Sequence, residues 1–93
     1  MLINIRKANQ KDAVSIVKMN KALALETESI TLDDQVIALG VAHCLNDSAK
    51  GSYFLAEYEG AVIGQLMFTF EWSDWRNGWI WWIQSVYVDP DFR

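Results

Sequence analysis

The sequence contains one cysteine, one proline and five glycines among its 93 residues. A single cysteine cannot form a disulfide or a cysteine-based metal site within the chain. Cys44 lies among apolar residues at helical spacing, so we interpret it as core filler rather than as a nucleophile served by His43. Few glycines and prolines also predict long elements and few loops.

Basic residues are few and scattered, and the net charge is −4. Because phosphate binding needs clustered lysine and arginine, we exclude nucleic acid as a partner. Four acidic residues, Glu26, Glu28, Asp33 and Asp34, follow one another without a basic residue between them. They suit a small cationic substrate, but a solvated loop beside two helix ends has the same composition.

Targeting and membrane signals are also missing. The sequence has no apolar run long enough to span a bilayer and no signal-peptide pattern. We therefore expect a cytoplasmic protein with no membrane partner.

The residues that are present describe one small globular domain, with 52% hydrophobic and 13% aromatic residues. Apolar alternation predicts a strand over residues 3–7. Helical periodicity predicts a helix over 10–26, capped by Asn9, and a second over 32–46, capped by Thr31.

The second half of the sequence has the alternation and turns of a sheet. Strands are predicted over residues 53–59, 61–71 and 79–88, joined by a tight turn at Glu59-Gly60 and by the turn SDWRNG at 73–78. The order is β-α-α-β-β-β. We therefore predict an α+β fold in which two helices pack on an antiparallel meander.

The last predicted strand is apolar on both faces. Regular alternation places Trp79, Trp81, Ile83 and Tyr87 on one face and Ile80, Trp82, Val86 and Val88 on the other. Two apolar faces are typical of a central strand that is covered on both sides. We therefore expect a partner, or protein beyond these residues, to cover it.

Two segments carry a resemblance to a known family. The strand end VYVDPDFR (86–93) and the hairpin EYEGAVIGQLMF (57–68), together with the element order, resemble the N-terminal half of a GNAT-type, acetyl-CoA-dependent N-acetyltransferase. In that family the fourth strand leads into a loop of pattern R/Q-x-x-G-x-G/A, which holds the pyrophosphate at a helix N-terminus. Arg93 matches the first position of this motif, and the glycines have no counterpart. The resemblance thus implies a truncated domain, inactive or weakly binding alone.

The resemblance also implies which residues would meet acetyl-CoA. The backbone of Val86, Tyr87 and Val88 matches the strand segment that pairs with the pantetheine arm, and Arg93 lies next to it. The N–H of Val86 would stabilise the oxyanion. The same backbone could instead pair with another strand.

Candidates for the general base are fewer. Family members that acetylate polyamines have a glutamate at the position of Gln84, but a glutamine can only orient a substrate or a water. Glu71, Glu26 or Glu28 could act through a water, although each also fits an exposed carboxylate. The family's general acid, a tyrosine on a later helix, has no counterpart, because Tyr87 matches a core-packing position.

All five tryptophans lie between residues 72 and 82. Trp72 and Trp75, beside acidic residues, could wall a pocket for an ammonium group through cation–π attraction, or they could be ordinary surface residues. Trp79 and Trp81 fit the sheet core or a subunit contact better.

Three functions remain open from the sequence. The first is an acetyltransferase half-domain that acts on a small amine. The second is a truncated, non-catalytic homo-oligomer, such as a homodimer, built on the last strand; that strand could instead meet a complementary C-terminal half. The third is an amine-binding module without chemistry.

Overall fold

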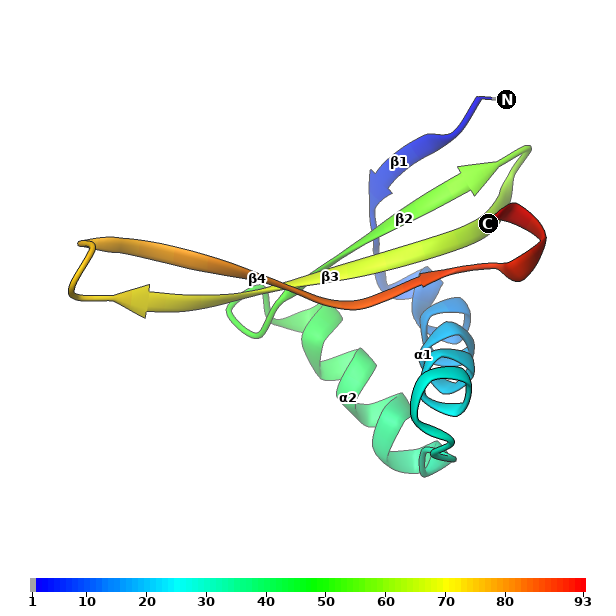
Figure 1. Cartoon of the computed structure of the whole chain (residues 1–93), viewed down its shortest axis with the longest axis horizontal. Helices are drawn as coiled ribbons and strands as arrows, with labels where there is room; N and C mark the ends of the chain where they lie inside the picture. Colours follow the sequence, from blue (N-terminus) through cyan, green and yellow to red (C-terminus); the bar gives the residue numbers. More distant parts are fainter. Residues whose placement is uncertain (1) are drawn as a thin grey trace.

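The computed structural model describes residues 2–93 as a four-stranded antiparallel sheet with two helices against one face (Figure 1). The strands are β1 (Asn4–Lys7), β2 (Ser52–Tyr58), β3 (Ala61–Ser73) and β4 (Gly78–Val88), and they pair in the order β1-β2-β3-β4. The chain closes with a 3-10 turn, η2 (Pro90–Phe92). The predicted α+β class and element order are confirmed.

The first helix starts with a 3-10 turn, η1 (Gln10–Asp12), and continues as α1 (Ala13–Glu28). Asn9 caps it as predicted, since its side chain accepts from the Lys11 N–H and Asp12 accepts from the Asn9 N–H. The helix runs two residues past the predicted end at 26. It stops at Ser29, which adopts a left-handed conformation with φ 55°.

The second helix, α2 (Asp34–Asn46), begins later than the predicted start at 32. The prediction that Thr31 caps it is wrong. Asp33 is the cap, and its carboxylate accepts from the Val36 N–H at 2.9 Å. A negative charge at this position also interacts favourably with the helix dipole, which a threonine hydroxyl cannot do.

The strands differ from their predicted bounds by one or two residues at their ends. β1 begins at Asn4 rather than at residue 3, and β2 covers 52–58 rather than 53–59. β3 continues to Ser73 and β4 begins at Gly78, because the pairing of the two strands continues to the turn. The turn at Glu59-Gly60 has positive φ at both residues, 51° and 80°, as a two-residue hairpin turn requires.

The core lies between the helices and the sheet. It is formed by Ile16 and Met19 from α1, Val41 and Cys44 from α2, and Tyr53 and Leu55 from β2. Cys44 is core filler as predicted, and burial raises the pKa of its thiol. No helix within residues 2–93 is long and apolar enough to cross a membrane.

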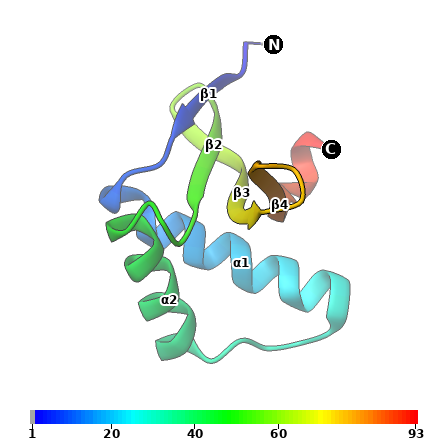
Figure 2. The same ribbon diagram turned by 90° about the vertical axis from the view of Figure 1, so that its left-hand side faces the viewer.

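The hairpin of β3 and β4 extends well beyond the helices (Figure 1), and Figure 2, seen from the hairpin end, shows both helices on one side of the sheet. The sheet face opposite the helices carries a row of aromatic contacts, which we call the aromatic face: Phe54, Phe68, Phe70, Trp72, Trp79 and Trp81. Nothing within residues 2–93 covers this face. Trp79 and Trp81 are accordingly 64% and 63% exposed.

Candidate functional site

A β-bulge interrupts β4 at the position that the sequence marks as the centre of a site. Gln65 pairs with Tyr87 and Met67 pairs with Gln84, so Leu66 alone lies opposite both Ser85 and Val86. Ser85 has a φ of 52°, a left-handed conformation that costs a non-glycine residue about 1–3 kcal/mol. The extra residue interrupts the ladder and bends the strand.

The bulge reverses which face the following residues occupy. Tyr87 packs against the core on the helix side. Trp81, before the bulge, contacts Phe68 and Phe70 on the aromatic face. The prediction that Tyr87 shares a face with Trp79, Trp81 and Ile83 is therefore wrong, because the regular alternation stops at Ser85.

Two cavities meet at the bulge. The first, which we call the Glu28 cavity, measures about 450 Å³ between α1, the segment after it, and β4, and its polar lining includes Asn20, Thr27, Glu28, Tyr53 and Ser85. The second, the Arg93 cavity, measures about 350 Å³ and is lined by Glu26, Tyr87, Val88 and Arg93. Both are lined by Leu23, Thr27 and Val86. Val86 thus stands at their junction.

The Arg93 cavity contains an ion pair between Glu26 and Arg93. Arg93 also donates from Nε to the Val88 carbonyl at 2.8 Å and lies 5.3 Å from the ring centre of Tyr87. The hydrogen bond from Arg93 lowers the pKa of Glu26, so this carboxylate is an ion held by a partner. The structure therefore separates the two predicted substrate carboxylates, since Glu28 lines the other cavity.

The remaining predicted residues lie on the β3–β4 hairpin away from both cavities. Gln84 donates to the Thr69 hydroxyl at 2.6 Å, and Glu71 accepts from the Trp82 indole N–H at 2.8 Å. Trp72 packs edge-on against Trp79, and Trp75 is 94% exposed at the tip of the turn. The structure does not bring Trp72 and Trp75 together with Glu26 or Glu28.

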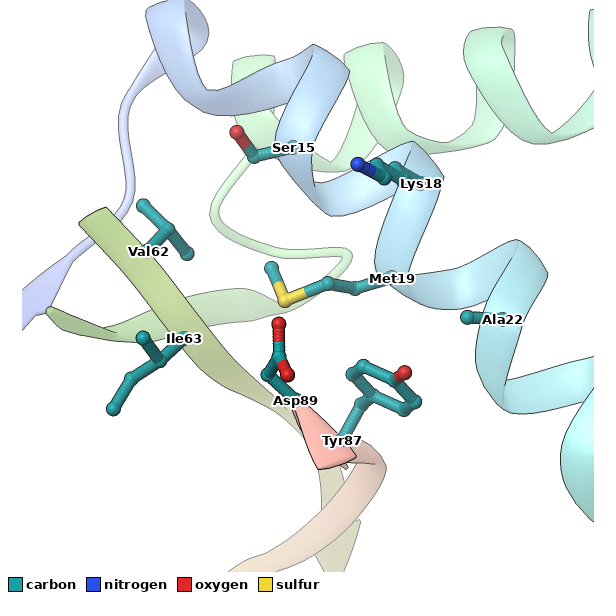
Figure 3. A pocket seen from close by; sticks show the side chains of 8 residues that line it. All are labelled: Ser15, Lys18, Met19, Ala22, Val62, Ile63, Tyr87 and Asp89. Carbon is teal, nitrogen blue, oxygen red and sulfur yellow. The ribbon is translucent and has the colours of Figure 1, made fainter. Parts of the chain in front are cut away.

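A third cavity, about 180 Å³, lies on the other flank of Tyr87 (Figure 3). Ser15, Lys18, Met19 and Ala22 of α1 line one side of it. Asp89, on the opposite side, is held in place by its own bonds, because its N–H donates to the Ile63 carbonyl and its carboxylate caps η2. We assign this cavity no part in the site.

Sequence reasoning missed three buried polar residues beside the bulge. Asn20, Tyr53 and Gln65 are 6%, 5% and 5% exposed and are joined by hydrogen bonds. Burial raises the pKa of the Tyr53 hydroxyl, which stays protonated. A signal was present, because Asn20 interrupts the apolar stripe of α1 and Gln65 interrupts an apolar strand.

Comparison with known proteins shows the family. The Acetyltransferase (GNAT) family matches residues 16–93, so the chain belongs to the GNAT family of acetyltransferases. A search of curated proteins returned no match.

Solved structures extend the comparison. A structure from Clostridium difficile 630, described as a possible acetyltransferase, is 48% identical with a TM-score of 0.94. The match covers 100% of this chain and 61% of that one. A predicted acetyltransferase with acetyl-CoA from Clostridium acetobutylicum is 22% identical with a TM-score of 0.80; the match covers 99% of this chain and 63% of that one. The chain thus spans about three-fifths of the length of these structures.

Proposed function

We propose that this chain takes part in the transfer of an acetyl group from acetyl-CoA to the amine of a small molecule. The observation that carries the proposal is the position of Val86, on the bulge where the two cavities meet. The Arg93 cavity would receive the arm of acetyl-CoA, and the Glu28 cavity would receive the amine. A solved structure of similar fold is described with acetyl-CoA, which supports acetyl-CoA as the acetyl donor.

The backbone of β4 fits the arm of acetyl-CoA. No strand within residues 2–93 pairs with the outer edge of β4, so N–H and C=O groups of Val86 to Val88 on this edge are available to an amide-bearing ligand, apart from the Val88 carbonyl that accepts from Arg93. Arg93, at the end of the same groove, offers a positive charge to a phosphate. Acetyl-CoA would supply the activated acetyl group as a thioester.

The roles of the chain's own groups follow from the charges that develop during acyl transfer. The N–H of Val86 would donate to the carbonyl oxygen as negative charge builds on it. The attacking amine must lose a proton as its nitrogen bonds to the acetyl carbon, and the departing sulfur must gain one. Glu28 is the carboxylate that lines the amine cavity, so we assign it the proton that the amine loses, relayed by a water. That proton balances the one that the departing sulfur gains.

Titration of the ¹⁵N-labelled 93-residue chain with acetyl-CoA tests the proposal. We expect the amide signals of Val86, Tyr87 and Val88 to shift, with a dissociation constant weaker than about 10 µM, because residues 1–93 contain no glycine-rich pyrophosphate loop. Adenosine bisphosphate, which lacks the arm, is the control and should leave Val86 unmoved. Unchanged β4 signals at millimolar acetyl-CoA would refute the assignment.

The glycine-rich loop gives a second test. A polypeptide carrying the remainder of the family domain, added to this chain, should produce transfer to a small amine, and neither component alone should do so. We expect Glu28→Gln to slow that transfer while the acetyl-CoA shifts stay unchanged.

The outer edge and aromatic face of β4 favour a second function, self-association. We propose that two copies pair through β4, which would cover Trp79, Trp81 and Ile83, all more than half exposed. Sedimentation at micromolar concentration is the measurement, and a stable monomer would exclude this function.

A further inference from the structure

A chain of hydrogen bonds crosses the core and ends at the bulge. The Asn20 amide on α1 donates to the Tyr53 hydroxyl on β2 at 3.3 Å. The Gln65 amide on β3 donates to Asn20 Oδ1 at 2.8 Å and to the Ser85 carbonyl on β4 at 3.4 Å. Side chains from three elements therefore form one bonded chain, and Gln65 is the member that reaches the peptide group on β4.

These side chains occupy positions where packing alone would favour apolar residues. A buried amide is unfavourable unless its hydrogen bonds replace those it made with water. The Gln65 Oε1 atom is buried and has no partner within residues 2–93, so the network is not even fully satisfied. A buried amide with an unpartnered oxygen calls for an explanation, and the two bonds of the Gln65 Nε2 group supply one.

The bonded carbonyl belongs to the peptide group that matters for the proposed chemistry. The Ser85 C=O and the Val86 N–H lie in one planar trans peptide unit, in which they point in opposite directions. Holding the carbonyl towards Gln65, inside the fold, therefore turns the N–H of Val86 outward. Ser85 has a left-handed conformation and lies at the bulge, where the regular hydrogen bonds between β3 and β4 are interrupted. Those bonds therefore do not fix the Ser85–Val86 peptide plane.

We propose that Gln65 and Asn20 are positioning residues that set the orientation of the Ser85–Val86 peptide plane. Gln65 holds the Ser85 carbonyl, and Asn20 fixes the Gln65 amide by accepting its other proton. The catalytic part of this inference rests on the proposed function, in which the Val86 N–H faces the acyl oxygen. The positioning itself does not depend on acetyl-CoA.

The test uses the ¹⁵N-labelled full chain and amide hydrogen exchange. Gln65→Met keeps the side-chain length and removes both polar groups, and Asn20→Leu removes the acceptor that orients Gln65. We expect both to shift the Ser85 and Val86 amide signals, while the Ile80 signal near the turn is unchanged. The double variant should add little to either single variant, because both act through one bond chain.

Gln10→Leu is the matched control, because Gln10 makes its hydrogen bond to Asn46 on the exposed surface. It should leave the bulge signals in place. A folded Gln65→Met with native Ser85 and Val86 signals would overturn the proposal.

A measurement on the unaltered chain covers the case in which the core variants do not fold. The side-chain amide protons of Gln65 should exchange at least about tenfold more slowly than those of Gln10. Equal rates would overturn the proposal. Titration with acetyl-CoA separates the two ideas: a protected Gln65 amide with no acetyl-CoA response refutes the proposed function and leaves the positioning role intact.

Discussion

Arg6 on β1 and Asp12 in η1 form a two-pronged ion pair in which both guanidinium-to-carboxylate distances are 2.8 Å. Asp12 is buried and also accepts from the Asn9 N–H at 2.8 Å. The pair therefore fastens the start of the first helix to the edge strand of the sheet. The hydrogen bond from Arg6 holds the pKa of Asp12 below its usual range.

This ion pair predicts a loss of stability in acid. Because the folded-state pKa of Asp12 is lowered, its contribution is fully present above the unfolded pKa of about 3.9 and is lost as the pH falls through the folded value. We expect Asp12→Asn to lower the free energy of unfolding by about 1–3 kcal/mol at neutral pH and by much less in acid. Urea denaturation at the two pH values measures the difference.

Asp47→Asn is the control for this variant, since the Asp47–Lys50 pair is exposed and such pairs contribute little. It should lose less stability than Asp12→Asn. An equal loss from Asp12→Asn at neutral and acid pH would contradict the prediction.

The left-handed backbone at Ser85 predicts opposite results for two substitutions. Ser85→Gly relieves the strain, whereas Ser85→Val adds a β-branched side chain where φ is 52°. We expect the glycine variant to be about 1–3 kcal/mol more stable than the valine variant in urea denaturation. Similar stabilities would mean that β4 loses its bulge in solution.

The ion pair in the Arg93 cavity predicts how charge changes affect acetyl-CoA binding. Glu26→Gln frees Arg93 from its partner, so we expect affinity to rise several-fold; Arg93→Ala should lower it about tenfold. Calorimetry of the two variants checks this, with Lys50→Ala as a distant charge control. The idea fails if Arg93→Ala binds acetyl-CoA as the native chain does.

The aromatic face predicts the effect of removing a tryptophan on self-association. Trp81→Ser should weaken association at least about tenfold, because Trp81 contacts both Phe68 and Phe70 there. Trp75→Ser, at the exposed turn, is the matched control and should leave it unchanged. Sedimentation velocity across a concentration series measures both, and equal behaviour would remove the aromatic face from the contact.

Two glycines provide a prediction about packing. A Cβ at Gly51 would lie 2.6 Å from Met67 Cε and 2.8 Å from the Phe68 carbonyl oxygen, so Gly51→Ala should cost about 1–3 kcal/mol. A Cβ at Gly40, in α2, would meet nothing within 4 Å. Gly40→Ala should therefore stabilise the protein by about 1 kcal/mol. Thermal denaturation of both variants checks the contrast.

The element order, the hairpin turns and the family could be predicted from the sequence, because periodicity and turn residues act locally. The site could be predicted only in part. Val86 and Arg93 were placed by the strand-end motif, whereas the bulge was missed because Ser85 and Val86 resemble ordinary strand residues. The bulge lies between the pairs that β4 forms with Gln65 and Met67 on β3, and no local pattern in the sequence encodes that pairing.

Asn20 illustrates the same limit. On the helix it occupies an apolar position, which sequence reasoning reads as part of the packing stripe. Its role becomes visible only when β2 and β3 bring Tyr53 and Gln65 to it. Trp72 and Trp75 show the opposite case. They lie close to acidic residues in the sequence, but the hairpin holds them away from the cavities between α1 and β4.

The bulge divides β4 into two pieces that make different contacts. Residues before Ser85 belong to the exposed hairpin and contribute to its aromatic face. Residues after it pack towards the helices and line the cavities. Substitutions before Ser85 can therefore change the aromatic face, and with it self-association, without changing the Glu28 and Arg93 cavities. Deleting the one extra residue would join the two pieces into a single regular strand and place Tyr87 on the aromatic face.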